Sequence, residues 1–158
     1  MASELAFRVN GIERRVTIDD SVPLIHVLRN EFDLKATRFG CGEEQCGACM
    51  VLVDGKPAYS CTLPVGDAAG RSIETAEAIA DGAHPLRQAF LDEQAGQCGY
   101  CLSGIVLSAK ALLDHNTAPS RAEIIAALEP HLCRCGAQGR MVRAVERAAS
   151  LLRNEVAA

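Results

Sequence analysis

Eight cysteines are the residues of this chain whose type and spacing could carry chemistry. They fall into two sets of four: Cys41, Cys46, Cys49 and Cys61, then Cys98, Cys101, Cys133 and Cys135. The N-terminus lacks a basic segment followed by an apolar one, so we expect no export signal and a reducing compartment, the cytoplasm. Closely spaced cysteines in such a compartment indicate a metal or redox site rather than disulfides.

The first set has the spacing Cys-x4-Cys-x2-Cys with a more distant fourth cysteine, which is typical of plant-type [2Fe–2S] ferredoxins. A structural zinc site more often uses two short Cys-x2–4-Cys segments separated by a longer loop. Small residues around these cysteines would let the loop curl around inorganic sulfide with its N–H groups pointing inward; they are Gly40, Gly42, Gly47 and Ala48. We therefore predict a [2Fe–2S] cluster here, with zinc as the alternative.

The second set, Cys98-x2-Cys101 and Cys133-x-Cys135, fits zinc and an iron–sulfur cluster equally well by spacing alone. Met50 and Leu102 stand where a c-type haem site would need histidine after Cys-x-x-Cys, so covalent haem is excluded. No Cys-x-His pair supports a Rieske centre. No group of residues resembles a catalytic acid–base or nucleophile arrangement, so we predict no catalytic residue in this chain.

Composition narrows the class of protein further. The 158 residues include 49% hydrophobic but only 4% aromatic residues, so aliphatic side chains must build the core. A net charge of −4 gives no support for nucleic-acid binding. No apolar run is long enough to insert in a membrane.

The first half of the chain reads as a small mixed sheet over one helix. Two strands are predicted around the turn Asn10-Gly11, and two more around Asp54-Gly55. A helix is expected near residues 23–28, with Asp20-Ser21 offering caps. The stretch Ser72–Thr75 is predicted to be a last strand at the edge of the sheet.

The second half reads as helices over residues 85–94, 102–115, 120–129 and 138–154, with Ser120 and Glu123 forming a capping box. The pattern looks internally repeated, because each pair of helices flanks one pair of cysteines. Two helical hairpins would bring both cysteine pairs to one end of a four-helix bundle, and neither hairpin would complete a four-thiolate site alone. We predict an α+β protein with domains at residues 1–76 and 77–158.

The segments CGEEQCGAC, QCGYC and CRCG, in this order and at these separations, resemble the small iron–sulfur subunit of molybdenum hydroxylases, the relatives of xanthine and aldehyde oxidases. The resemblance covers nearly the whole chain and is strongest to bacterial isoquinoline oxidoreductase and nicotinate dehydrogenase small subunits. It implies a β-grasp ferredoxin domain followed by a four-helix bundle, each with one [2Fe–2S] cluster.

The same resemblance implies an electron-transfer role within a larger enzyme. A large subunit would bind a molybdenum–pterin dinucleotide and hydroxylate an N-heteroaromatic compound or an aldehyde. Electrons would then pass through both clusters to a flavin or cytochrome c subunit, and this chain would not turn over substrate alone. A partner carrying a signal could also export it. The alternative is a soluble ferredoxin-like carrier with a zinc-stapled helical docking domain.

By resemblance, the Gln97 side chain contacts the pterin and Cys135 lies beside it. The sequence departs from the family pattern nearby, since many relatives have Asn before the second cysteine pair and this chain has His131. The histidines are nevertheless predicted to be surface or capping residues. The stripe Arg140, Arg143 and Arg147 is predicted to be a solvated helix face rather than a partner contact.

Overall fold

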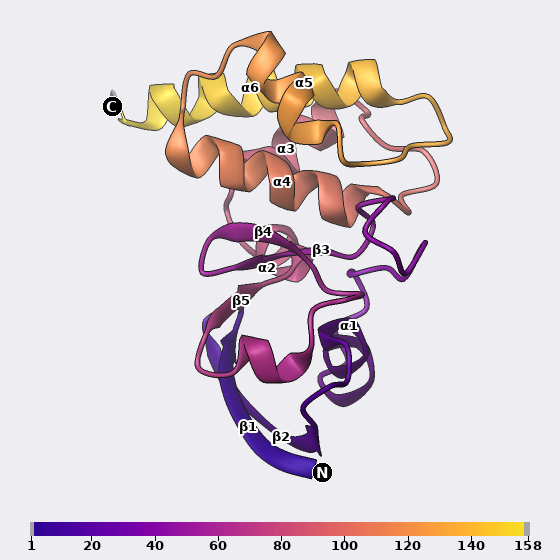
Figure 1. Cartoon of the computed structure of the whole chain (residues 1–158). Coiled ribbons are helices and arrows are strands. Elements are labelled where there is room, and N and C mark those ends of the chain that lie inside the picture. Colours follow the sequence, from indigo (N-terminus) through magenta and orange to yellow (C-terminus); the bar gives the residue numbers. More distant parts are fainter. Residues whose placement is uncertain (1, 157–158) are drawn as a thin grey trace.

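One five-stranded mixed sheet forms the N-terminal half of the computed structural model, which describes residues 2–156 (Figure 1). Its strands are β1 (Ala2–Val9), β2 (Ile12–Asp19), β3 (Met50–Val53), β4 (Lys56–Tyr59) and β5 (Ser72–Glu74). Both predicted hairpins are confirmed. Asn10-Gly11 joins β1 to β2, and Asp54-Gly55 joins β3 to β4, with φ between 50° and 81° at all four residues. Asn, Asp and Gly tolerate this conformation best, which is why they mark the turns.

The position of β5 differs from the prediction. It lies at the centre of the sheet, in the order β2-β1-β5-β3-β4, parallel to β1 and antiparallel to β3. Its central residue, Ile73, is fully buried. A three-residue strand carries too little alternation to reveal how many neighbours it has, so the prediction of an edge strand was wrong.

The helix after β2 starts later than its predicted caps. It comprises α1 (Leu24–His26) and a π-helical turn, η1 (Val27–Glu31). The Ser21 N–H donates to the Asp19 carboxylate at 3.0 Å, so these residues form a turn and do not cap the helix. The predicted apolar positions are nevertheless right, because the side chains of the following four residues are buried under the sheet: Leu24, Ile25, Val27 and Leu28.

The C-terminal half is helical. After the short 3-10 helix η2 (Val65–Ala68) and β5 come α2 (Ala76–Asp81), α3 (Pro85–Asp92), α4 (Leu102–His115), α5 (Arg121–Leu128) and α6 (Gln138–Val156). The predicted helices are therefore confirmed, with ends that differ by a few residues. The Ser120–Glu123 capping box is present in both directions: Glu123 N–H donates to Ser120 Oγ at 3.2 Å, and Ser120 N–H donates to the Glu123 carboxylate at 2.7 Å.

Strand β3 joins the two halves. Val51 and Val53 belong to the core between the sheet and α1, whereas Leu52 points to the other face and belongs to the core of the helices. Helix α4 lies directly against this face (Figure 1). An ion pair between Lys110 of α4 and Glu74 of β5, with Nζ and Oε2 3.2 Å apart, lies at the same junction. The helical layer is thus attached to the sheet through a strand that is buried on both faces.

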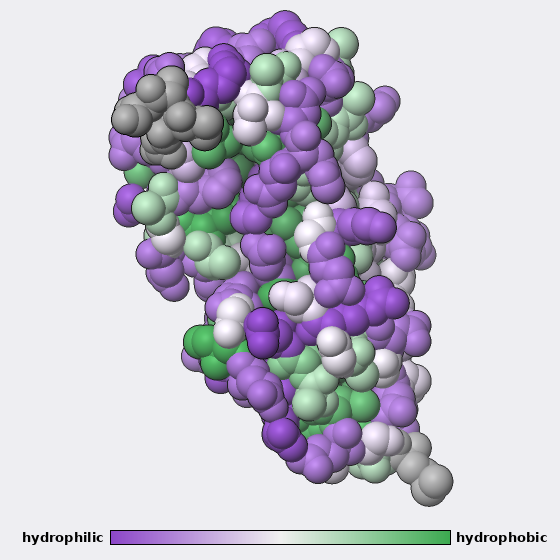
Figure 2. Space-filling view, turned by 90° about the vertical axis from the view of Figure 1, so that its left-hand side faces the viewer, coloured by the Kyte–Doolittle hydropathy of each residue, from purple (hydrophilic) through white to green (hydrophobic). Residues whose placement is uncertain are grey.

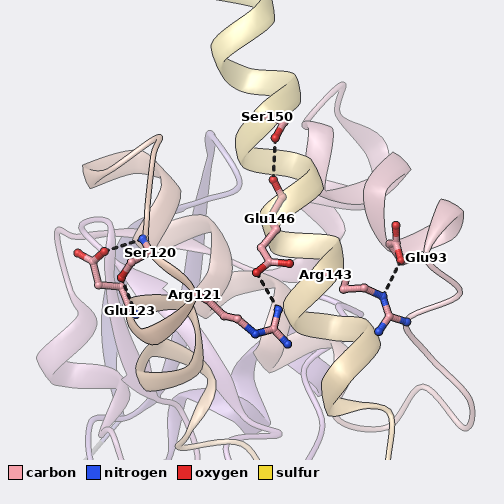
Figure 3. A network of polar contacts seen from close by, with 7 residues as sticks. All are labelled: Glu93, Ser120, Arg121, Glu123, Arg143, Glu146 and Ser150. Atoms are coloured by element: carbon pink, nitrogen blue, oxygen red, sulfur yellow. Dashed lines mark hydrogen bonds and ion pairs between the residues drawn. The ribbon is translucent and has the colours of Figure 1, made fainter.

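Two arginines of the predicted stripe on α6 form ion pairs with the end of α3. Arg143 pairs with Glu93 at 3.2 Å (Figure 3). Arg147 pairs with Asp92 at 2.7 Å, and both carboxylates lie at the end of α3. These arginine side chains remain about half exposed, as predicted for a solvated face, and such pairs contribute little to stability.

The face drawn in Figure 2 is mainly hydrophilic, with separate hydrophobic patches. No helix within residues 2–156 is both long and apolar enough to cross a membrane.

Candidate metal centres

The first cysteine set lies on one continuous loop and the hairpin that follows it. Cys41 and Cys46 are on the loop, Cys49 directly precedes β3, and Cys61 follows β4. The β3–β4 pairing therefore carries Cys49 and Cys61 side by side, and the Ser60 hydroxyl donates to the Cys49 carbonyl at 2.6 Å. The local hairpin fixes two thiols, and the loop brings the other two to them.

Backbone N–H groups point at the loop thiols. The N–H groups of Glu43 and Gln45 lie 3.3 and 3.2 Å from Cys41 Sγ, and the Cys41 N–H lies 3.4 Å from Cys46 Sγ. Donation from Glu43 is the largest cause that lowers the pKa of the Cys41 thiol to about 7. These donors favour thiolates, which are the form that ligates iron.

Three loop glycines are required by close approach or by their backbone conformation. A Cβ on Gly40 would lie 2.6 Å from Cys46 Sγ, and Gly42 adopts φ +73°. Gly47 has φ +70° and no room for a side chain either. The predicted reason for the glycines, a loop curled tightly around its thiols, agrees with this geometry, and the site therefore fits a cluster.

The second cysteine set is assembled from two hairpins. Cys98 and Cys101 lie between α3 and α4, and Cys133 and Cys135 lie between α5 and α6. Each hairpin supplies one thiol to each of two close pairs, Cys101 with Cys133 and Cys98 with Cys135. The predicted gathering of both cysteine pairs at one end of the bundle is confirmed.

Both sets share one arrangement, a more accessible pair of thiols and a buried pair. Cys49 and Cys61 are buried in the first set, as are Cys101 and Cys133 in the second. Burial raises the pKa of Cys49 and of Cys101 to about 12 each. Within residues 2–156, no three potential ligand side chains converge as they would around a single metal ion. Thiols in pairs suit a two-iron cluster, in which each iron takes two protein ligands.

The two sets face each other across one cavity. It has a volume of about 410 Å³, and thiol-bearing residues of both sets line it together with Tyr100, Leu132 and Arg134. The lining cysteines are Cys41 and Cys46 of the first set and Cys98, Cys101 and Cys133 of the second. Two redox groups held here would be neighbours.

Gln97 and Cys135, which the sequence resemblance placed together, are in contact. The Gln97 side-chain amide donates to the Cys135 carbonyl at 3.1 Å, and both residues lie at the accessible end of the bundle. Gln97 also lines a groove of about 690 Å³ between α2, α3 and the start of α4. Its contact with a pterin stays a prediction.

His131 was misjudged from the sequence. It is neither a surface nor a capping residue, because its side chain is buried between the two cysteine-bearing regions with 7% exposure. Burial lowers the pKa of its imidazole to about 4, so the ring is neutral. His84 does cap a helix, since its Nδ1 accepts from the Leu86 N–H at 3.1 Å. The one available signal for His131 was its departure from the family pattern beside Cys133.

Two family models match the chain. A "2Fe-2S iron-sulfur cluster binding domain" covers residues 7–80, and a "[2Fe-2S] binding domain" covers residues 75–146. The second match favours a [2Fe–2S] cluster over zinc in the helical half, because residues 75–146, which include the second cysteine set, match a [2Fe–2S] binding domain.

Two curated relatives are similar to the chain over nearly their full length. The chain is 45% identical to one subunit of the nicotinate dehydrogenase of Pseudomonas putida, over 97% of this chain and 99% of that relative. It is 43% identical to the alpha subunit of isoquinoline 1-oxidoreductase from Brevundimonas diminuta, over 92% and 97% of the two chains.

Solved structures agree with the relatives. Quinoline 2-oxidoreductase of Pseudomonas putida 86 contains a chain with a TM-score of 0.91 and 32% identity, with 97% of both chains covered. Aldehyde oxidoreductase of Desulfovibrio desulfuricans matches with a TM-score of 0.92 and 40% identity, over 97% of this chain but 17% of its own. In that protein the matching region is one part of a much longer polypeptide.

Proposed function

Because the chain belongs to the family of two-cluster iron–sulfur subunits of molybdenum hydroxylases, we propose that it relays electrons from a molybdenum–pterin site in a large partner subunit to a separate acceptor. The observation that carries this proposal is the common cavity between the two thiol sets, because two one-electron sites held there would be neighbours. A relay needs such adjacency, whereas a carrier with a zinc-stapled domain does not.

All eight cysteines serve as ligands in this proposal. Cys41, Cys46, Cys49 and Cys61 hold the first [2Fe–2S] cluster, and Cys98, Cys101, Cys133 and Cys135 hold the second. When bound, each cluster takes up and releases a single electron. The chain's contribution is to supply thiolates and N–H donors, with Gly42 and Gly47 letting the first loop close.

The second cluster is the one that receives electrons from the large subunit. Support comes from the exposed Cys98 thiol and from the Gln97 side chain beside Cys135, both at the open end of the bundle. The first cluster then passes electrons to a flavin or cytochrome c subunit. The names of the relatives favour an N-heteroaromatic substrate, with an aldehyde as the second candidate.

The domain boundary and the cellular compartment are also part of this proposal. We place the boundary between residues 76 and 77, after the first residue of α2. The cytoplasm stays a prediction for the compartment, with export alongside a partner as its alternative.

Metal analysis and spectroscopy of the purified chain test the proposal. We expect about four iron atoms per chain and two distinct paramagnetic signals after dithionite reduction. The chain without its partner should accept electrons from dithionite but show no substrate-dependent dye reduction. Stoichiometric zinc with a single signal would overturn the two-cluster relay, and substrate turnover by the isolated chain would contradict the division of labour between subunits.

A further inference from the structure

The His131 side chain lies where the two cluster-binding regions meet. Its Nε2 is 2.7 Å from Ser108 Oγ of α4, and this pair is buried. Its Nδ1 is also buried, has no hydrogen bond of good geometry within residues 2–156, and lies on the side of the ring that faces Gly47 of the first loop. One imidazole thus touches both α4 of the bundle and the loop that carries Cys46 and Cys49.

Space around the ring is fully used. A Cβ on Gly47 would lie 2.3 Å from His131 Nδ1 and 2.8 Å from the Pro130 carbonyl oxygen. A Cβ on Gly104 would lie 2.1 Å from the Gly47 carbonyl oxygen and 3.1 Å from His131 Cε1. Glycine at both positions lets three segments of the chain interlock around one histidine.

Backbone contacts run through the same junction. The Leu132 N–H donates to the Cys46 carbonyl at 3.1 Å, so the residue after His131 is bonded directly to a cysteine of the first set. Cys133, a cysteine of the second set, follows next in the chain. This hydrogen bond and the segment His131–Cys133 therefore link Cys46 of the first set to Cys133 of the second.

We infer that His131 is a positioning residue, which with Ser108 holds the two cluster loops in fixed register and so sets the geometry of electron transfer between the clusters. The inference rests on the proposed cluster ligation. Electron transfer between two sites slows steeply as their separation grows. A buried ring clamped between Gly47 and Gly104 keeps the two loops from moving apart because close-packed interiors deform little.

The test uses the chain with both clusters reconstituted. His131→Leu keeps the volume but removes the hydrogen bond, and His131→Gln retains a polar atom near the position of Nε2. His115→Leu is the matched control, because His115 is an exposed histidine at the end of α4. Two quantities are measured: the magnetic dipolar coupling between the two reduced clusters, and the rate of inter-cluster electron transfer after rapid injection of one electron.

We expect His131→Leu to broaden or weaken the dipolar splitting and to slow inter-cluster transfer several-fold, with iron content unchanged. His131→Gln should recover most of the splitting and the rate, and His115→Leu should match the wild type. An unchanged splitting and rate in His131→Leu, accompanied by a lower melting temperature, would show that the histidine only fills space and would overturn the inference.

Ser108→Ala keeps the ring and serves if His131→Leu does not fold. It should weaken the splitting and slow transfer in the same direction, and wild-type values in it would equally overturn the inference. Failure of the proposed ligation is distinguishable, since the wild-type chain itself would then lack iron or one of the two signals.

Discussion

The two thiol sets reach the same arrangement by different routes. The first set is contained in one loop and its hairpin, so a single stretch of chain determines it. The second takes two thiols from the α3–α4 hairpin and two from the α5–α6 hairpin. In both sets, two of the four thiols are buried and the other two are more accessible to solvent. The difference is in what a cluster would do for the fold: it closes a local loop in the first region and fastens two separate hairpins in the second.

The largest expected effect comes from removing one ligand in each region. Cys133→Ala should abolish the second cluster. It should lower the free energy of unfolding by about 3–4 kcal/mol, because the cluster cross-links the chain between Cys98 and Cys135 and a cross-link that closes a loop of such length stabilises the fold by about this amount. Cys46→Ala should abolish the first cluster with a smaller loss, because strand pairing still holds the β3–β4 hairpin. Iron analysis and denaturant unfolding measure both effects.

Each variant should retain about two iron atoms and one paramagnetic signal. The comparison between the regions fails if Cys46→Ala destabilises the chain as much as Cys133→Ala does.

Gly104→Ala tests the junction between the regions. A methyl group there would lie 2.1 Å from the Gly47 carbonyl oxygen, so backbone must move, and overpacking of this kind costs about 1–3 kcal/mol. Gly139→Ala in α6 is the matched control. Nothing lies within 4 Å of a Cβ at Gly139, and alanine is the better helix former, so the melting temperature should be unchanged or rise. Equal melting temperatures for the two variants would mean that the junction is loose.

Gln97→Ala sharpens the comparison at the accessible end of the bundle. Both clusters should remain, because no ligand is lost. The variant would lose the hydrogen bond predicted between the Gln97 side chain and the pterin. One neutral hydrogen bond is worth about 0.5–1.5 kcal/mol, so substrate-driven cluster reduction in the assembled complex should slow by about tenfold or less. Reduction by dithionite should stay normal, and rapid-mixing absorbance separates the two.

The matched control for Gln97 is Gln88→Ala, an exposed glutamine on α3. Unchanged substrate-driven reduction in Gln97→Ala, with normal pterin content, would leave Gln97 only its bond to the Cys135 carbonyl.

The smallest effect on the clusters and on electron transfer is expected at the start of α5. Ser120→Ala removes one side of the capping box and should cost about 0.5–2 kcal/mol, measured by thermal unfolding (Figure 3). Ser150→Ala on α6 is the control, because within residues 2–156 Ser150 bonds only to Glu146 and Arg153 of its own helix. Iron content should not change in either variant. Loss of the second cluster in Ser120→Ala would contradict this expectation. It would mean that the start of α5 is needed to position Cys133, although most of this helix is exposed.

Sequence alone predicted the features that local chemistry determines. The Asn10-Gly11 and Asp54-Gly55 turns, the Ser120–Glu123 capping box and the bounds of α4 follow from residues within a few positions of one another. The gathering of the second thiol set was also predictable, because the two hairpins have the same order of helix, cysteine pair and helix.

Features that depend on distant neighbours were not predictable in this way. The central place of β5 needs the parallel pairing of Arg8 with Ser72, which no local pattern encodes. The burial of His131 needs Gly47 and Gly104 to leave room for the ring, and these residues are far from it in sequence. The shared cavity between the two thiol sets follows from the same packing and could be expected only through family resemblance.

The central position of β5 has a consequence for the order of folding. The β1–β2 and β3–β4 hairpins pair neighbours in the chain and can form early, but between them the sheet has a gap that only residues 72–74 fill. All four cysteines of the first set precede that strand. During synthesis the first thiols are therefore present before the sheet that supports them is complete. Closure of the sheet is a late, non-local step, so we expect it to limit the folding rate of this half.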